Sequence, residues 1–199
     1  FKIGPLKLIG DGSLGARTAY MTQPYNDDDN TCGIPIYTQE QLDEMVEYAH
    51  KNGMHVVIHC IGDKIMYMVV EAMEKALKKY PKEDHRHGIV HCQITTKELL
   101  DKFKELKLHA YIQSIFLDYD INIVEDRIGK ERAKYTYNFK TLMDSGVITS
   151  NGSDCPVELP NVMNGVQCAV TRKTLDGKGP FLPEQALSVE EAIKSYTIM

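Results

Sequence analysis

The feature of this sequence that most restricts its fold is a short apolar run followed by an amphipathic segment, repeated about four times with short connections. Expected strands are 5–9, 55–60, 88–92, 109–113 and 147–150; expected helices are 38–53, 63–79, 95–107, 138–145, 161–171 and 188–199. The charged segment 117–138 is expected to form surface helix and loop. This order predicts a parallel sheet covered by helices. Such a sheet is either open and doubly wound or part of an eight-stranded barrel.

One expected helix is marked at both ends. Thr38 and Gln41 have the spacing of a capping box, in which each side chain accepts a backbone N–H of the other residue. Gly53 follows the last apolar position and matches a helix stop signal. Two signals that agree on one segment make this helix the best defined in the sequence.

A glycine motif of the form G-x-G-x-x-G at residues 10–15 has the spelling of a dinucleotide-binding loop. In that loop the last glycine opens a helix, whose N-terminus binds a pyrophosphate. Here the chain continues through Pro24, an acidic run at 27–29 and Pro35, which is typical of a long irregular loop. The sequence therefore argues against a nucleotide-dependent oxidoreductase.

Charge, hydropathy and cysteine content indicate which classes of partner and which cellular compartment to expect. The net charge is −5 and no basic stripe is visible, which argues against a nucleic-acid partner. No apolar run reaches membrane-spanning length and no signal peptide is recognisable, so no membrane partner is expected. Five cysteines without a Cys-x-x-Cys pair favour a reduced, cytoplasmic protein. Because the chain starts at Phe1 and stops within a helical pattern, we expect a fragment of a longer protein.

Four expected strands carry a ligand-type side chain at or near the C-terminal end: Lys7, His59, His91 and Asp154. Reacting groups gather at this end of the strands in both architectures. A buried polar side chain there needs a hydrogen bond or a metal. Two imidazoles and a carboxylate predict a divalent metal, with zinc favoured. The alternative is that each of these residues is structural.

The remaining histidines are expected to lie away from such a site. His85 and His87 fall in a charged loop and are expected to be solvated. His55 and His109 begin strands, so they are expected at the opposite end of the sheet. Three other residues are candidates for substrate contact: Arg17, Gln113 and Arg172.

Five motifs occur in one order along the chain: KLIGDGSLGARTA at 7–19, HCIGD at 59–63, IVHCQ at 89–93, GSDCPVE at 152–158 and AVTR at 169–172. Together they resemble the amidohydrolase superfamily, in the branch that includes N-substituted formamide deformylase. The resemblance covers essentially the whole chain. It implies a (β/α)8 TIM-type barrel that hydrolyses carbon–nitrogen bonds of amide or formamide-like, non-peptide small molecules. The glycine motif then belongs to the long loop after the fourth barrel strand.

The resemblance also implies roles for the four strand-end residues. Lys7 matches a lysine that reacts with carbon dioxide to give a carbamate, which is an anionic metal ligand. His59 and His91 match the ligands of strands five and six. Asp154 matches the strand-eight aspartate, which binds metal or accepts a proton from the attacking water and returns it to the leaving amine. The complete protein would hold one or two ions, zinc first.

The sequence departs from this family in one respect. The family's first strand supplies a His-x-His pair, and the only such spelling here, at 85–87, lies in a loop before a later strand. Residues 1–199 are therefore expected to form a single incomplete barrel domain, approximately strands four to eight with their helices. We expect the chain alone to be inactive and to associate with another copy through exposed strand edges. The alternative is a degenerate barrel with a binding or regulatory role.

Overall fold

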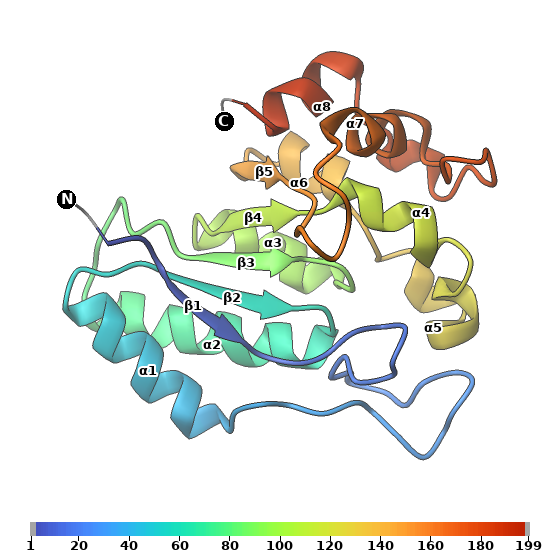
Figure 1. Cartoon of the computed structure of the whole chain (residues 1–199). Coiled ribbons are helices and arrows are strands. Elements are labelled where there is room, and N and C mark those ends of the chain that lie inside the picture. The colour runs from blue at the N-terminus through green and yellow to red at the C-terminus, as the bar shows by residue number, and fades with distance from the viewer. Residues whose placement is uncertain (1–2, 198–199) are drawn as a thin grey trace.

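The computed structural model describes residues 3–197, in which the strands form one five-stranded parallel sheet (Figure 1). The strands are β1 (Leu6–Ile9), β2 (Val56–Cys60), β3 (Gly88–His91), β4 (His109–Ile112) and β5 (Thr149–Asn151). Each strand pairs in parallel with the next strand of the chain. This order never reverses, whereas a doubly wound sheet reverses at a switch point. The structure thereby selects the barrel segment over the open sheet.

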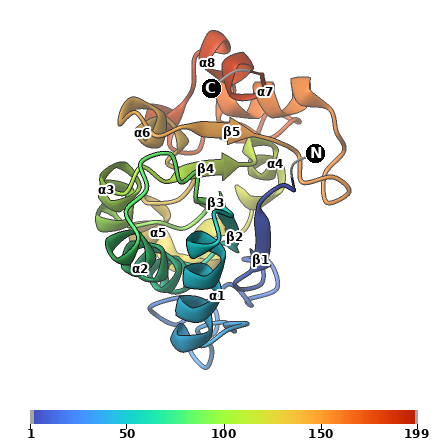
Figure 2. The same cartoon turned by 90° about the vertical axis from the view of Figure 1, so that its left-hand side faces the viewer.

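The helices are α1 (Gln39–Lys51), α2 (Asp63–Lys79), α3 (Lys97–Glu105), α4 (Leu117–Asp120), α5 (Val124–Ala133), α6 (Phe139–Asp144), α7 (Val162–Thr171) and α8 (Val189–Ser195), with 3-10 turns at Ser114–Phe116 and Pro183–Gln185. The helices lie along the outer side of the curved sheet, except α4 and α5, which lie beyond the C-terminal ends of the strands (Figure 1). Figure 2 shows α2, α3 and α6 on one side of the strands. On the other side the sheet is open, since Lys7 and Ile9 are exposed while Leu8 between them is buried. Among residues 3–197, no helix combines the length and hydropathy that a membrane crossing requires.

Most expected elements form within one or two residues of their predicted bounds. Helix α1 has the predicted capping box: the Thr38 hydroxyl accepts the Gln41 N–H, and the Gln41 side chain accepts the Thr38 N–H at 2.9 Å. Gly53 has φ +79, the left-handed conformation that a helix stop requires. Helix α2 matches its predicted bounds, and α8 is shorter than predicted within the described residues.

The segment 117–138 is more buried than the sequence indicates. Leu117, Val124 and Ile128 pack into the core, although charged residues surround them in the sequence. The segment is broken into short pieces, and Gly129 has φ +74 inside α5. Such breaks remove the 3.6-residue periodicity by which an amphipathic helix is recognised. Helix and loop form here as expected, but the expectation that the segment lies on the surface was wrong for these apolar residues.

His85 and His87 are buried, contrary to the predicted solvated loop, with 4% and 0% of their surface exposed. His87 Nδ1 accepts the N–H of Val56 at 3.0 Å, so its ring hydrogen lies on Nε2 and is donated to His50 Nδ1 at 2.8 Å. His50 donates from Nε2 to the Tyr80 carbonyl at 2.6 Å. His85 Nδ1 accepts the His87 N–H at 2.9 Å. Each of these rings is held as one neutral tautomer, at the end of the sheet where the strands begin.

Acidification is expected to destabilise the fold through His87. Burial lowers the His87 pKa to about 3, with smaller contributions from His85 and His50. The unfolded chain takes up a proton below about pH 6.5 that the folded chain does not, so the free energy of unfolding falls as the pH falls from 6.5 toward 3. Between pH 7.5 and pH 5 this single ring accounts for about 2 kcal/mol. Urea unfolding at both pH values measures this effect. His87→Gln should remove this part of the pH dependence of the unfolding free energy, and His55→Gln should leave it unchanged. An unchanged pH dependence in His87→Gln would contradict the assignment.

Candidate functional site

A cavity of about 190 Å³ lies at the end of the sheet where the strands stop. Each of the five strands of residues 3–197 contributes to its lining through the loop that follows it, with Leu14, Ile61, Gln93, Phe116 and Val157 as examples. In Figure 1 the strand arrows point toward this side, where the long loop after β1 and helix α4 are found. This is the end at which parallel α/β barrels place their active sites.

Lys7 lies on the open face of β1. Its register partner on β2 is Val57, while Ile9 pairs with His59. Because side chains alternate along a strand, Lys7 is on the same face as His59 and one layer nearer the start of the strands. Desolvation lowers the Lys7 pKa, and the negative charge of Asp154 opposes that shift. Lys7 therefore lies within the electrostatic reach of a residue from the far end of the sheet.

One ring nitrogen of His59, Nε2, lies close to protein oxygens. Its Nε2 is 2.9 Å from the Gly12 carbonyl and 3.3 Å from Asp11 Oδ1. Both partners are acceptors, so the neutral form of the ring carries its hydrogen on Nε2 and its lone pair on Nδ1. The loop after β1 therefore fixes the tautomer of the β2 histidine.

The His91 ring lies next to the His59 ring because the backbone of β3 changes conformation at His91. Its register partner is Cys60, so strict alternation would put it on the opposite face from His59. His91 instead has φ +78, and its ring lies with its centroid 4.3 Å from that of His59. Its Nδ1 bonds Gln113 Oε1 at 2.8 Å, which leaves the lone pair on Nε2. Burial, followed by the neighbouring His59, lowers the His91 pKa to about 3, so the ring is neutral.

Asp154 lies beyond the end of β5, in a loop that its own φ of +56 turns over the sheet. Asp residues adopt this left-handed conformation more readily than most. The Asp154 Oδ2 is 4.0 Å from His91 Nε2, which is too long for a hydrogen bond. Since Asp154 is also exposed, its carboxylate is accessible from the cavity end of the sheet.

The donor set matches the chemistry of a divalent cation. Among residues 3–197, no three His, Cys, Asp or Glu side chains are close enough to hold a metal by themselves. His59 and His91 nevertheless each have one nitrogen bonded to a protein acceptor and one with a lone pair, which is how metal-binding histidines are held. A third ligand would have to come from Lys7 in an anionic form or from Asp154.

The three residues expected to contact substrate lie in different settings. Gln113 bonds His91, so its visible role is to orient that ring. Arg17 is partly exposed and forms two hydrogen bonds with Asp27, at 3.0 and 2.8 Å, within the loop after β1. Arg172 is 1% exposed and donates to two backbone carbonyls, which assigns it to the structure and not to the cavity wall.

Asp11 is a residue of the site that the sequence analysis does not single out. It is 1% exposed and accepts the backbone N–H groups of Tyr20, Ile61 and Gly62 at 2.8, 3.1 and 2.8 Å. It thereby ties the loop after β1 to the loop after β2 and also lies beside His59. The sequence signal that could have identified Asp11 is its position in a glycine-rich run directly after a strand.

Comparison with known proteins agrees with the resemblance found in the sequence motifs. The chain matches the amidohydrolase family over residues 1–199. It is 36% identical over 199 residues to YtcJ of Bacillus subtilis strain 168, which is named as an amidohydrolase, covering 98% of this chain and 37% of the relative. N-substituted formamide deformylase of Arthrobacter pascens is 24% identical over 168 residues, covering 83% of this chain and 30% of that protein.

Among solved structures, an uncharacterized metal-dependent hydrolase from Pyrococcus horikoshii OT3 is similar, with a TM-score of 0.87 and 34% identity. The match covers 98% of this chain and 38% of that one. The chain thus spans less than two fifths of the length of these relatives. The fold is that of part of a (β/α)8 barrel, as the motifs predicted.

Proposed function

The chain belongs to the amidohydrolase family, and we propose that the protein of which it is part hydrolyses a carbon–nitrogen bond in amide or formamide-like, non-peptide small molecules. The observation that carries this proposal is the pair of adjacent imidazoles, His59 and His91, each oriented by a hydrogen bond from one ring nitrogen to a protein oxygen. A divalent metal held there, zinc first, would lower the pKa of a bound water and polarise the scissile carbonyl.

We assign Lys7 the role of a third ligand after reaction with carbon dioxide. The neutral amine adds to the carbon of carbon dioxide and forms an N–C bond, while the electron pair of one C=O bond moves to its oxygen. The nitrogen releases a proton to solvent, which leaves a carbamate anion. An ammonium cannot bind a cation, whereas a carbamate oxygen can. The position of Lys7 on the same sheet face as His59 supports this role, as does the desolvation of its amine.

We assign Asp154 the proton transfers. Its carboxylate is exposed at the end of β5 and is not held by a hydrogen bond to His91. It can therefore accept the proton of an attacking water and deliver it to the leaving amine. Asp154 is then an unprotonated carboxylate again at the end of each reaction.

The proposal is tested by zinc binding and by carbamate formation on the purified chain. With bicarbonate present, dialysis should leave about one zinc per chain, and ¹³C-labelled bicarbonate should give a lysine carbamate signal in the NMR spectrum. Lys7→Ala should lose the signal and bind zinc at least about tenfold more weakly. Lys97→Ala, on the exposed surface of α3, should change neither. A chain that binds no zinc and forms no carbamate would contradict a metal site preformed in residues 1–199. Restoring a first strand with a His-x-His pair would then separate an incomplete hydrolase from a degenerate barrel.

Turnover by the 199-residue chain is not expected, because the sequence offers no His-x-His pair at the site. The one such pair lies before β3 and is buried among histidines at the opposite end of the sheet. Metal-dependent release of an amine from an N-alkylformamide by this chain would contradict that expectation.

A further inference from the structure

We propose that the cavity at the C-terminal end of the sheet selects substrates whose non-reacting end is an apolar group carrying an ammonium or amidinium cation. The inference rests on the proposed function for the reaction itself, but the charge preference follows from the cavity walls alone. The argument uses the shape of the cavity, one buried carboxylate with an oxygen left without a partner, and a second carboxylate nearby.

The cavity is apolar over most of its wall and adjoins His91 through Phe116. Leu14, Ile61, Phe116 and Val157 contribute hydrocarbon to it. The Phe116 ring stacks on His91, with centroids 5.6 Å apart and planes inclined by 19°. A volume of about 190 Å³ accommodates a phenyl ring with a short chain, since apolar cavities of about 150 Å³ bind benzene. An apolar substituent can therefore lie against the ring that flanks the reacting centre.

Asp120 is the polar residue that this cavity leaves unsatisfied. It is 8% exposed and lines the cavity. The Tyr137 hydroxyl and Gln93 Nε2, the latter at 2.9 Å, both donate to Oδ2. Within the described residues, no hydrogen bond reaches Oδ1. Oδ1 is not among the fully buried unpaired side-chain atoms of the described residues, so it is accessible from the cavity. A donor from a ligand can bind there in place of water.

Glu158 places a second carboxylate in the same lining. Burial raises the Asp120 pKa to about 6, and the charge of Glu158 makes the smallest contribution. No Lys, Arg or His of residues 3–197 is part of the cavity lining. Arg172 is outside this lining; its Nε and Nη1 donate to backbone carbonyls, and its Nη2 is buried without a partner. Two carboxylates in a wall without a cationic side chain attract a ligand cation and repel a ligand anion.

Three probes of similar size separate charge from shape: phenethylammonium, 2-phenylethanol and 3-phenylpropionate. Titrated into the zinc-free chain and followed by NMR, the cation should bind at least about tenfold more tightly than the alcohol, because a charge-assisted hydrogen bond replaces a neutral one. The anion should show the weakest binding of the three. Asp120→Asn and Glu158→Gln should each lower the affinity for the cation by about fivefold or more, with the affinity for the alcohol within about twofold.

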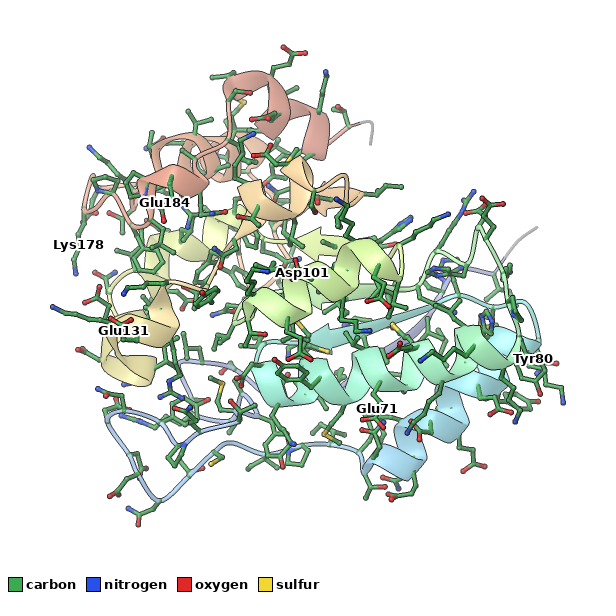
Figure 3. The ribbon with its side chains drawn as sticks, turned by 180° about the vertical axis from the view of Figure 1, so that it is seen from behind. Glu71, Tyr80, Asp101, Glu131, Lys178 and Glu184 are labelled. Atoms are coloured by element: carbon green, nitrogen blue, oxygen red, sulfur yellow. The ribbon has the colours of Figure 1, made fainter. Side chains whose placement is uncertain are left out.

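Asp101→Asn is the matched control, since it removes the same charge from the outer helix α3, where Figure 3 labels this residue. Glu158 is only partly buried, so Glu158→Gln keeps the test valid if Asp120→Asn unfolds. Equal affinity for cation and anion, a cation preference that survives both substitutions, or no saturable binding of any probe would overturn the proposal. Because the titration needs neither zinc nor turnover, a failure of the hydrolase proposal would appear separately, in the dialysis experiment.

Discussion

Asp11→Ala is expected to lower the free energy of unfolding by about 3–5 kcal/mol. The carboxylate is buried and accepts three backbone N–H groups, from Tyr20, Ile61 and Gly62. Each buried donor left without a partner costs about 1–3 kcal/mol, and some of this cost is recovered when the loops relax or admit water. The loss also releases the loop after β1 from His59, so the site and the fold are weakened together.

Urea unfolding at constant pH measures this effect. Asp11→Asn keeps one acceptor oxygen and should cost about half as much as the alanine variant. Asp101→Ala removes an exposed carboxylate that pairs with Lys97, and should change stability by less than about 1 kcal/mol. A loss below about 1 kcal/mol for Asp11→Ala would show that the three N–H groups find other partners.

The elements and the parallel sheet could be predicted because local signals agree with the global fold. The capping box of Thr38 and Gln41 and the apolar runs of β2 and β3 each point to the element that forms. The end of the sheet that carries the site follows from the same pattern, since parallel strands stop at a common edge. The choice between a barrel segment and an open sheet depends on strand order, which no local signal encodes.

Two parts of the site depend on geometry that residue types do not report. Strand alternation separates His91 from His59, and only the left-handed backbone at His91 brings the two rings together. The loop histidine His87 sits among charged residues in the sequence yet is fully buried, because the strand start at Val56 offers it a backbone donor. Both outcomes depend on contacts between segments far apart in the chain, so one segment's composition could not predict them.

The order of zinc affinities among single variants is expected to separate a built metal site from incidental histidine binding. His59→Ala and His91→Ala each remove a nitrogen ligand and should lower the affinity by roughly 10²–10³-fold. Gln113→Ala leaves both ligands but frees His91 Nδ1, so a loss of roughly 10–100-fold is expected. Gln113→Glu should restore most of that loss, because a carboxylate accepts the same ring hydrogen.

His55→Ala provides the control for that series, since His55 precedes β2 and lies at the opposite end of the strand from His59. Competition with a chromophoric chelator at pH 7.5 gives the affinities. If all histidine variants, including His55→Ala, lose zinc to the same degree, the ion is bound by scattered surface imidazoles. If Gln113→Ala alone matches the wild-type chain, the ring of His91 is held by packing and its hydrogen bond does not set the metal affinity. Only the graded order, with Gln113→Ala between the ligand variants and the control, requires that His91 bind the metal through Nε2 while Gln113 holds Nδ1.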